Sequence, residues 1–265
     1  MTGRDGVRGL AAGVLGGAAS GLFGVGGGLA IVPALTAFFG TTQHQAHGTS
    51  LAVICATALA AVVVYGAHAN VVWSIAAPMA LGSLVSAPLG ARLATRISAS
   101  GLRRAFAVFL VLVALRLLWE PPAVSGTAVP AGIAGIAISL LVGFAAGVVA
   151  GFMGVGGGIL VVPFLTLVFG LSQQAAQGTS LAVMLVTAPM ATWEHSRHGN
   201  VVWRLVPMLA VGTVLAAPGA AWIAQRLPHT LLTRAFAVFL LITAIHTWTR
   251  SSRTEPVREV ATPSR

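Results

Sequence analysis

Residues 20–53 read SGLFGVGGGLAIVPALTAFFGTTQHQAHGTSLAV, and residues 150–183 read AGFMGVGGGILVVPFLTLVFGLSQQAAQGTSLAV. At a fixed offset of 130 residues, 20 of these 34 positions are identical. The same offset holds without a gap at two later pairs of segments: Asn70–Trp73 with Asn200–Trp203, and Arg104–Leu110 with Arg234–Leu240. Self-similarity at one fixed period indicates an internal repeat. The sequence therefore predicts two homologous halves.

The repeat also predicts the domain boundaries. We expect a first membrane repeat over 1–120, a linker over 121–129, a second membrane repeat over 130–250, and a polar C-terminal tail over 251–265. Proline, serine, glycine and threonine are concentrated in the linker, which is typical of a connection between folded units.

Charge is too sparse for an ordinary soluble enzyme. The chain has 265 residues, of which 57% are apolar and only 8% are charged, and its mean hydropathy is +0.92. A soluble domain carries about 25% charged residues. No charged residue occurs in the 83 positions between Arg8 and Arg92, nor in the 73 between Glu120 and Glu194. One membrane helix needs about 20 apolar residues. The chain is therefore predicted to be an all-α polytopic membrane protein.

The basic net charge of +10 does not indicate a nucleic-acid partner. All fifteen cations are arginine, and they lie between the apolar segments, as in cytoplasmic membrane loops. The lipid bilayer is the partner that this pattern predicts. The single cysteine, Cys55, excludes an internal disulfide framework and a cysteine-rich metal site. We expect neither a cofactor nor a metal.

Six of the apolar segments have the length of one membrane helix. They are expected near 47–65, 71–92, 102–118, 177–194, 201–222 and 232–248.

Two longer apolar segments, 9–39 and 137–169, have GVGGG near the middle. A straight helix of more than 30 residues would run about 45 Å, whereas the hydrocarbon core is about 30 Å thick. Glycine in a helix interior costs roughly 1 kcal/mol. Each segment is therefore predicted to break into two half-helices of about 15 residues, either as a re-entrant hairpin or as one broken span. The total is about eight hydrophobic segments.

The arginines favour the re-entrant alternative. If each broken segment crosses the membrane once, the halves are parallel and the arginines divide into 9 inside and 6 outside. If each returns to its own side, every half has three full spans, the second half is inverted, and the division is 12 inside and 3 outside. The stronger inside bias favours inverted-topology repeats. It also places the N- and C-termini in the cytoplasm.

GVGGG is the first candidate for an anion site. Its glycines expose successive backbone N–H groups, and a half-helix that begins beside them directs its positive end to the same place. Close helix packing is the alternative, since glycine is also favoured there in membranes. The residues that we expect to bind the anion are Gly26, Gly27 and Gly28 with Gly156, Gly157 and Gly158.

GTS is the second repeated motif. The hydroxyls of Thr49 and Ser50, and of Thr179 and Ser180, are predicted either to contact the anion or to cap a helix. The amides of Gln43 and Gln173 have the same two alternatives.

An intramembrane hydrolase is a weaker hypothesis. Ser50 has His44 and His47 nearby, but the second copy has glutamine at both histidine positions. A serine nucleophile needs an adjacent base. We therefore expect no enzymatic activity.

Three histidines are candidates for a proton relay, because histidine titrates near neutral pH. His68 and His198 match across the repeats, and His195 lies beside His198. Their alternative role is that of solvated loop residues.

The duplicated GVGGG and GTS motifs, with a proline and FG between them, resemble the TauE/SafE family of sulfite exporter-like membrane permeases. The resemblance covers both halves. It implies transport of small sulfur-containing anions such as sulfite, sulfoacetate or other sulfonates, outward across the bacterial inner membrane. We therefore expect a secondary transporter in the cell membrane with the anion bound between the broken-helix ends. The alternative is a non-transporting scaffold or complex subunit, and a homo-oligomer stays open.

Overall fold

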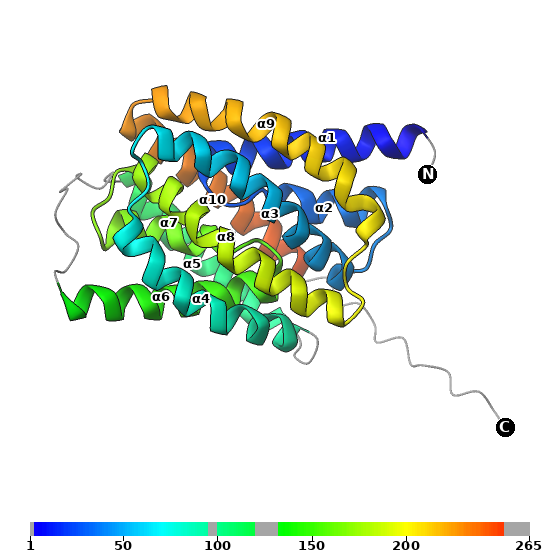
Figure 1. The fold of residues 1–265 in the computed structure, drawn as a ribbon, viewed down its shortest axis with the longest axis horizontal. Coiled ribbons are helices and arrows are strands. Elements are labelled where there is room, and N and C mark those ends of the chain that lie inside the picture. The colour runs from blue at the N-terminus through cyan, green and yellow to red at the C-terminus, as the bar shows by residue number, and fades with distance from the viewer. Residues whose placement is uncertain (1–2, 95–99, 120–131, 252–265) are drawn as a thin grey trace.

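The computed structural model describes residues 3–94, 100–119 and 132–251. These residues form ten α-helices and one short 3₁₀-helix with no β-strand, which confirms the all-α class (Figure 1). The helices before residue 120 are α1 (Gly3–Phe23), α2 (Gly28–Phe38), α3 (Gln43–Ala67), α4 (Trp73–Ala94) and α5 (Ser100–Trp119). The later ones are α6 (Ile133–Met153), α7 (Gly158–Leu167), α8 (Gln173–Arg197), η1 (Trp203–Leu205), α9 (Val206–Arg226) and α10 (His229–Ser251). The expected linker, 121–129, and nearly all of the expected tail lie outside the described residues.

Six helical segments are long and apolar enough to cross a membrane, judged by length and composition. They are Asp5–Phe23, Gln43–Ala67, Trp73–Ala94, Ile133–Met153, Trp203–Arg226 and His229–Thr249. Two apolar helices, α2 and α7, are shorter, with 11 and 10 residues. The architecture is that of a multi-pass membrane protein.

The chain breaks at GVGGG, but the half-helices are unequal. The expectation of two arms of about 15 residues is wrong, since α1 and α6 each have 21 residues and precede a short second arm. The first arms begin at Gly3 and Ile133, before the apolar segments used to predict them. At 1.5 Å per residue each is about 31 Å long, which matches the hydrocarbon core. Only the second arm is half-length.

The chain reverses direction at the first GVGGG. A Cβ atom on Gly16, in the middle of α1, would lie 2.7 Å from Ile31 of α2. The Arg8 guanidinium, near the start of α1, lies 6.0 Å from the centre of the Phe38 ring at the end of α2. Hence α2 runs back along α1 toward the end where α1 began, as in a hairpin and unlike a continuous broken span.

The helices α3 and α8 cross the centre in opposite directions. Gly48, near the start of α3, packs against Asn200, just after α8. Gly178, near the start of α8, packs against Asn70, just after α3. Because α3 and α8 correspond at the offset of 130, matching helices of the two halves point to opposite ends of the molecule.

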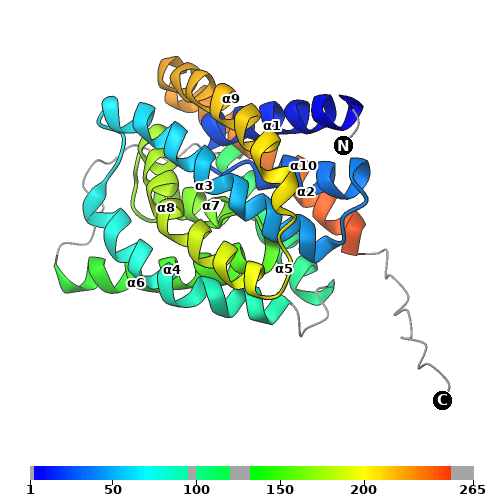
Figure 2. The same ribbon diagram turned by 45° about the vertical axis from the view of Figure 1, so that its right-hand side comes forward.

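Two long helix pairs flank this centre, with α1 beside α9 on one side and α4 beside α6 on the other (Figures 1 and 2). The pairs pack through glycines: a Cβ atom on Gly17 would lie 2.6 Å from the Thr213 carbonyl oxygen, and one on Gly143 would collide with the Met79 carbonyl. Small residues let helix backbones approach closely in membranes. This explains the glycines of α1 and α6 without any ligand.

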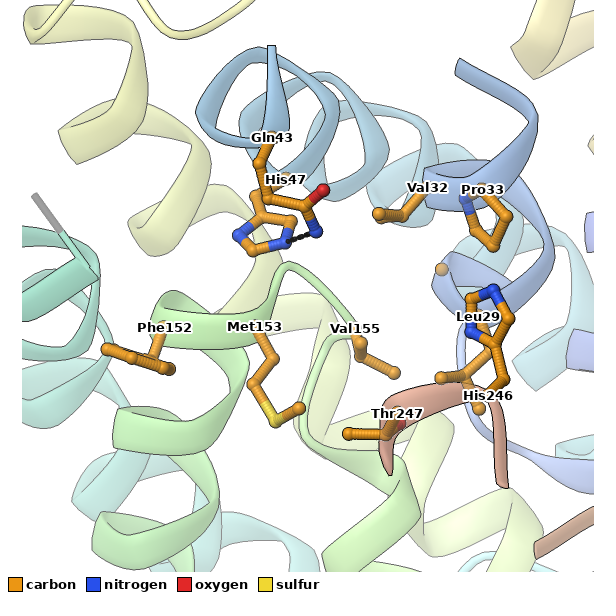
Figure 3. A pocket seen from close by; sticks show the side chains of 11 residues that line it. Leu29, Val32, Pro33, Gln43, His47, Phe152, Met153, Val155, His246 and Thr247 are labelled. Atoms are coloured by element: carbon orange, nitrogen blue, oxygen red, sulfur yellow. Dashed lines mark hydrogen bonds between the residues drawn. The ribbon is translucent and has the colours of Figure 1, made fainter. Parts of the chain in front are cut away.

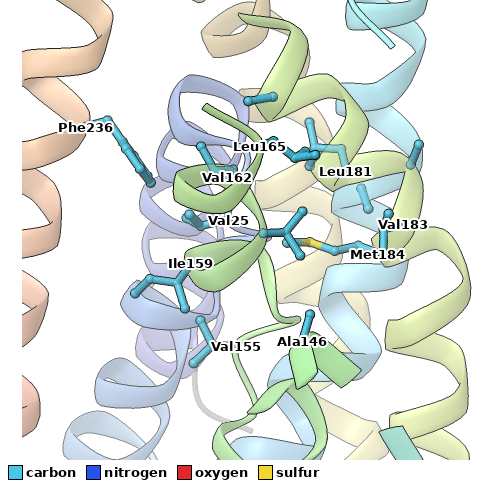
Figure 4. Packing of buried hydrophobic residues seen from close by; sticks show 14 of the residues in the cluster. Val25, Ala146, Val155, Ile159, Val162, Leu165, Leu181, Val183, Met184 and Phe236 are labelled. Atoms are coloured by element: carbon cyan, nitrogen blue, oxygen red, sulfur yellow. The ribbon is translucent and has the colours of Figure 1, made fainter. Parts of the chain in front are cut away.

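The largest hydrophobic cluster fills the space between these layers. Val25 and Val155, the valines of the two GVGGG motifs, belong to it, together with Ile159 of α7 and Met184 of α8 (Figure 4). Both glycine loops are therefore buried at the centre of the bundle.

Candidate functional site

The two GVGGG loops meet at the centre of the molecule. A Cβ atom on Gly28 would lie 2.7 Å from the Gly154 carbonyl oxygen, and one on Gly158 would lie 2.5 Å from the Gly24 carbonyl oxygen. Gly26 and Gly156 have φ angles of +79° and +80°, in the left-handed region that favours glycine. The motif thus needs glycine both for its backbone conformation and for the approach of the two loops.

The starts of α2 and α7 are brought to the same region. Their N-caps, Gly27 and Gly157, supply no side-chain hydrogen bond. The first N–H groups of a helix have no partner inside the helix, and the helix dipole adds a partial positive charge there. Gly28 and Gly158 therefore begin two helices whose positive ends lie near each other in the centre of the bundle.

A pocket that is partly open to the outside leads to the start of α2 (Figure 3). It lies between α2, α3, the end of α6 and the end of α10. Its lining residues are Gly28, Leu29, Val32, Pro33, Gln43, His47, Phe152, Met153, Val155, His246 and Thr247. We call it the open pocket. Of the residues expected to bind the anion, it contains Gly28 and Gln43.

The polar groups of the open pocket come from α3 and α10. Gln43 Nε2 lies 2.8 Å from His47 Nε2, and His246 and Thr247 lie on the opposite wall (Figure 3). The sequence did not predict His47, His246 or Thr247 as residues of the site. His47 shares a helix face with Gln43 at four-residue spacing, which was an available signal. His246 has Arg116 at the matching position, so the repeat gave no signal for it.

The threonines of the GTS motifs bind the loops of the opposite half. Thr49 Oγ1 accepts a hydrogen bond of 2.9 Å from the Val202 backbone N–H. Thr179 Oγ1 accepts one of 3.0 Å from the Val72 backbone N–H. Both motifs therefore join the halves reciprocally, and this explains why GTS and NVVW recur together.

The two GTS serines lie beside the glycine loops. Ser180 Oγ donates a hydrogen bond of 2.8 Å to the Gly24 carbonyl. Ser50 Oγ is buried and has no hydrogen-bond partner among the described residues. The arrangement does not bring Ser50 into a hydrogen bond with His47, which a serine nucleophile would need.

The second half places its glutamines differently from the first. Gln173 and Gln177 are 0% exposed. Both side-chain polar atoms of Gln173, and Nε2 of Gln177, have no partner among the described residues. An unsatisfied buried polar group costs about 1–3 kcal/mol. The burial of these two amides at the start of α8 is therefore energetically unfavourable.

The three candidate relay histidines are not brought together. His68 is exposed at the end of α3 and lies 2.8 Å, through Nδ1, from the Val64 carbonyl oxygen. His195 and His198 lie at the opposite end of the bundle, near the end of α8. His195 is 1% exposed, and its Nε2 lies 2.9 Å from the Gly151 carbonyl oxygen.

An ion pair lies at the end of the bundle that carries His195. Arg92 Nε donates to Glu194 Oε1 at 2.7 Å. The Glu194 side chain is 2% exposed, whereas that of Arg92 is 51% exposed. The matching positions of the repeat hold Val64 and Trp222, so the opposite end cannot form this pair.

Comparisons with known proteins agree on one kind of protein. The family model described as "Sulfite exporter TauE/SafE" matches residues 3–117 and 138–265. YunE of Bacillus subtilis, named a probable membrane transporter protein, is 26% identical over 262 residues, which cover 89% of this chain and 93% of the relative. A probable membrane transporter protein of Xylella fastidiosa is 29% identical over 250 residues, covering 91% and 94%. No solved structure matches the chain.

Proposed function

The chain belongs to the TauE/SafE family, and from this premise we propose that it is a secondary transporter that exports a small sulfur-containing anion, such as sulfite, sulfoacetate or another organosulfonate. The observation that carries the proposal is the meeting of the α2 and α7 starts, at Gly28 and Gly158, in the centre of the bundle. In secondary transporters, the ends of interrupted helices hold the substrate near the midplane.

The chemistry of the open pocket suits an oxyanion. Among the residues that the structure describes, its lining contains no Arg, Lys, Asp or Glu. Backbone N–H groups at the start of α2 and the Gln43 amide can donate hydrogen bonds to sulfonate oxygens. The substrate would then be held by dipoles, and no permanent cation would have to be stripped of water in the bilayer.

We propose that the halves are inverted-topology repeats with cytoplasmic termini. The opposite directions of α3 and α8 support this arrangement. The Arg92–Glu194 ion pair also supports it, because it puts Arg92 at the same end as Arg197. Parallel repeats would require these two arginines on opposite sides of the membrane. The proposed repeats occupy 1–120 and 130–250.

Export is favoured by the membrane potential. When the inside of the membrane is negative, moving one negative charge outward gains about 2.3 kcal/mol per 100 mV. That free energy supports a gradient of roughly fiftyfold, since 1.4 kcal/mol is tenfold. A coupled proton is therefore unnecessary for export of a monovalent anion.

Flux of radiolabelled sulfite into proteoliposomes under an imposed potential tests the proposal, with taurine and sulfoacetate as competitors. We expect flux that depends on the sign of the potential. Leu29→Trp, which fills the open pocket, should abolish it. The matched control is Leu59→Trp, at a side chain that is 58% exposed on the outside of the bundle. Correctly inserted wild-type protein that moves none of the three solutes, each supplied radiolabelled in turn, would contradict the proposal.

A further inference from the structure

The two ends of the bundle differ although their residues correspond at the offset of 130. In the open pocket, Leu29 and Gln43 are partly exposed. Their counterparts, Ile159 and Gln173, are 0% exposed. The positions that form a pocket at one end are therefore buried at the other.

The buried end still carries the groups of a binding site. Gln173 and Gln177 keep amide atoms without partners, although buried polar groups are nearly always hydrogen-bonded. They lie on the first turns of α8, ahead of Ser180, whose Oγ would be 2.8 Å from a Cβ atom on Gly158. The amides and the start of α7 together offer N–H donors, as Gln43 and the start of α2 do in the open pocket.

The hydroxyl of Tyr65 links three helices at the closed end by hydrogen bonds. Tyr65 is the only tyrosine in the chain and is 0% exposed. Its hydroxyl lies 2.8 Å from both the Gly21 carbonyl oxygen and Gln177 Oε1, so one donor joins α3 to α1 and α8. At the open end the matching residue is His195, whose ring Nε2 lies 2.9 Å from the Gly151 carbonyl oxygen.

An aromatic stack covers the same end. The ring centre of Phe23, at the end of α1, lies 4.6 Å from that of Phe239 and 6.0 Å from that of Phe236 on α10. The counterpart of Phe23 is Met153, which lines the open pocket. A flexible methionine thus stands at the open end where a stacked ring stands at the closed end.

We propose that Gln173 and Gln177 form a second half-site for the same class of oxyanion, and that Tyr65 is the positioning residue that keeps it closed. The half-site opens toward the membrane face opposite to the open pocket. When the Tyr65 hydroxyl releases Gln177 Oε1, the Gln177 side chain can turn and direct its Nε2 donor toward the anion, next to that of Gln173. This inference rests on the proposed transport function. The second half-site would bind the anion when the protein is open toward the opposite face of the membrane.

Cysteine labelling in the full chain tests the inference. In a Cys55→Ala background, Gln43→Cys and Gln173→Cys are each exposed to a membrane-impermeant maleimide from either face of oriented proteoliposomes. We expect Gln43→Cys to react from one face and Gln173→Cys to be protected. Adding Tyr65→Phe should raise the labelling rate of Gln173→Cys about fivefold, from the opposite face, because one hydrogen bond holding the closed state is lost.

Thr57→Val is the matched control. It removes a buried hydroxyl from the same helix, where Thr57 Oγ1 donates only to the Val53 carbonyl, at 2.9 Å. This change should leave Gln173→Cys protected. Labelling of Gln173→Cys without Tyr65→Phe, labelling of both cysteines from one face, or unchanged protection in well-folded Tyr65→Phe would each overturn the inference.

The labelling result is separable from the transport proposal, because it reports access and not flux. The expected labelling without sulfite flux would contradict the proposed substrate and leave the half-site supported. Sulfite flux with failed labelling would overturn the half-site alone.

Discussion

The open and closed ends of the bundle share one backbone plan but differ in a few side chains. Both ends have a long helix, a glycine break, a short returning helix and a GTS motif held by a loop of the opposite half. Met153, His195 and His47 at the open end correspond to Phe23, Tyr65 and Gln177 at the closed end. The repeated backbone therefore supplies the same helix arrangement at both ends, and the side chains that differ between the halves decide which end is accessible.

Disrupting the glycine-mediated packing of the long helices should cause the largest loss of stability, and the loss should be similar at both ends. Gly143→Leu drives a side chain into the Met79 carbonyl, and Gly13→Leu, its counterpart, into that of Leu209. Each should cost more than about 4 kcal/mol, since neither backbone can move away. Loss of monodisperse protein in detergent is the measurement.

The control is Gly219→Ala, because a Cβ atom there has no neighbour within 4 Å. It should stabilise the helix by up to about 1 kcal/mol. A Gly143→Leu protein with wild-type thermal stability would refute the close packing of α4 on α6.

Truncating Phe23, which stacks on α10 at the closed end, should cost more stability than truncating its counterpart Met153 at the open end. Phe23→Ala should lower the free energy of unfolding by about 2 kcal/mol, less than for a fully buried phenylalanine, because Phe23 is partly exposed. Met153→Ala should cost roughly half as much, since Met153 faces the open pocket. Thermal unfolding in detergent measures both. Equal losses would argue against an end-specific closure.

Replacing a buried amide at the closed end should raise the free energy of unfolding. Gln173→Leu replaces an unpartnered buried amide with an apolar side chain of similar size, and it should stabilise the protein by about 1 kcal/mol. Gln43→Leu should instead destabilise the protein by about 1 kcal/mol, because it removes the hydrogen bond of 2.8 Å between Gln43 Nε2 and Nε2 of the buried His47. Destabilisation by Gln173→Leu would mean that the amide has a partner in the native protein.

The ion pair at the open end should have the smallest effect. Glu194→Gln should cost less than about 1 kcal/mol, because the Arg92 side chain is half exposed and partly screened. The loss should shrink at high salt. A loss that does not depend on salt would show that Glu194 acts through packing and not through charge.

Much of the fold could be predicted from the sequence because its charge and glycine patterns follow directly from the requirements of a membrane helix. Uncharged stretches gave the membrane class, and GVGGG gave the chain breaks. The lengths of the helices around the breaks could not be predicted, since no cap or charge marks the start of α6. The reciprocal GTS contacts were also missed, because the partner of Thr49 is 153 residues away, at Val202.

The candidate site was only partly accessible to sequence reasoning. The repeat indicated the glycine starts and Gln43, which line or adjoin the open pocket. It gave no reason to select His246, Tyr65 or Phe23, because these residues differ between the halves. Self-comparison finds what the halves share, whereas accessibility depends on what they do not share.

Sulfite flux in Gln43→Leu and Gln173→Leu is the most direct test of the account. Only Gln43 lines the open pocket, yet an anion that passes between the two ends must meet both amides. We expect each variant to lose at least about tenfold in potential-driven flux, since a hydrogen bond to a charged group contributes about 1.5–3 kcal/mol. Wild-type flux in a well-folded Gln173→Leu protein would contradict the account, because the closed end would then be packing alone.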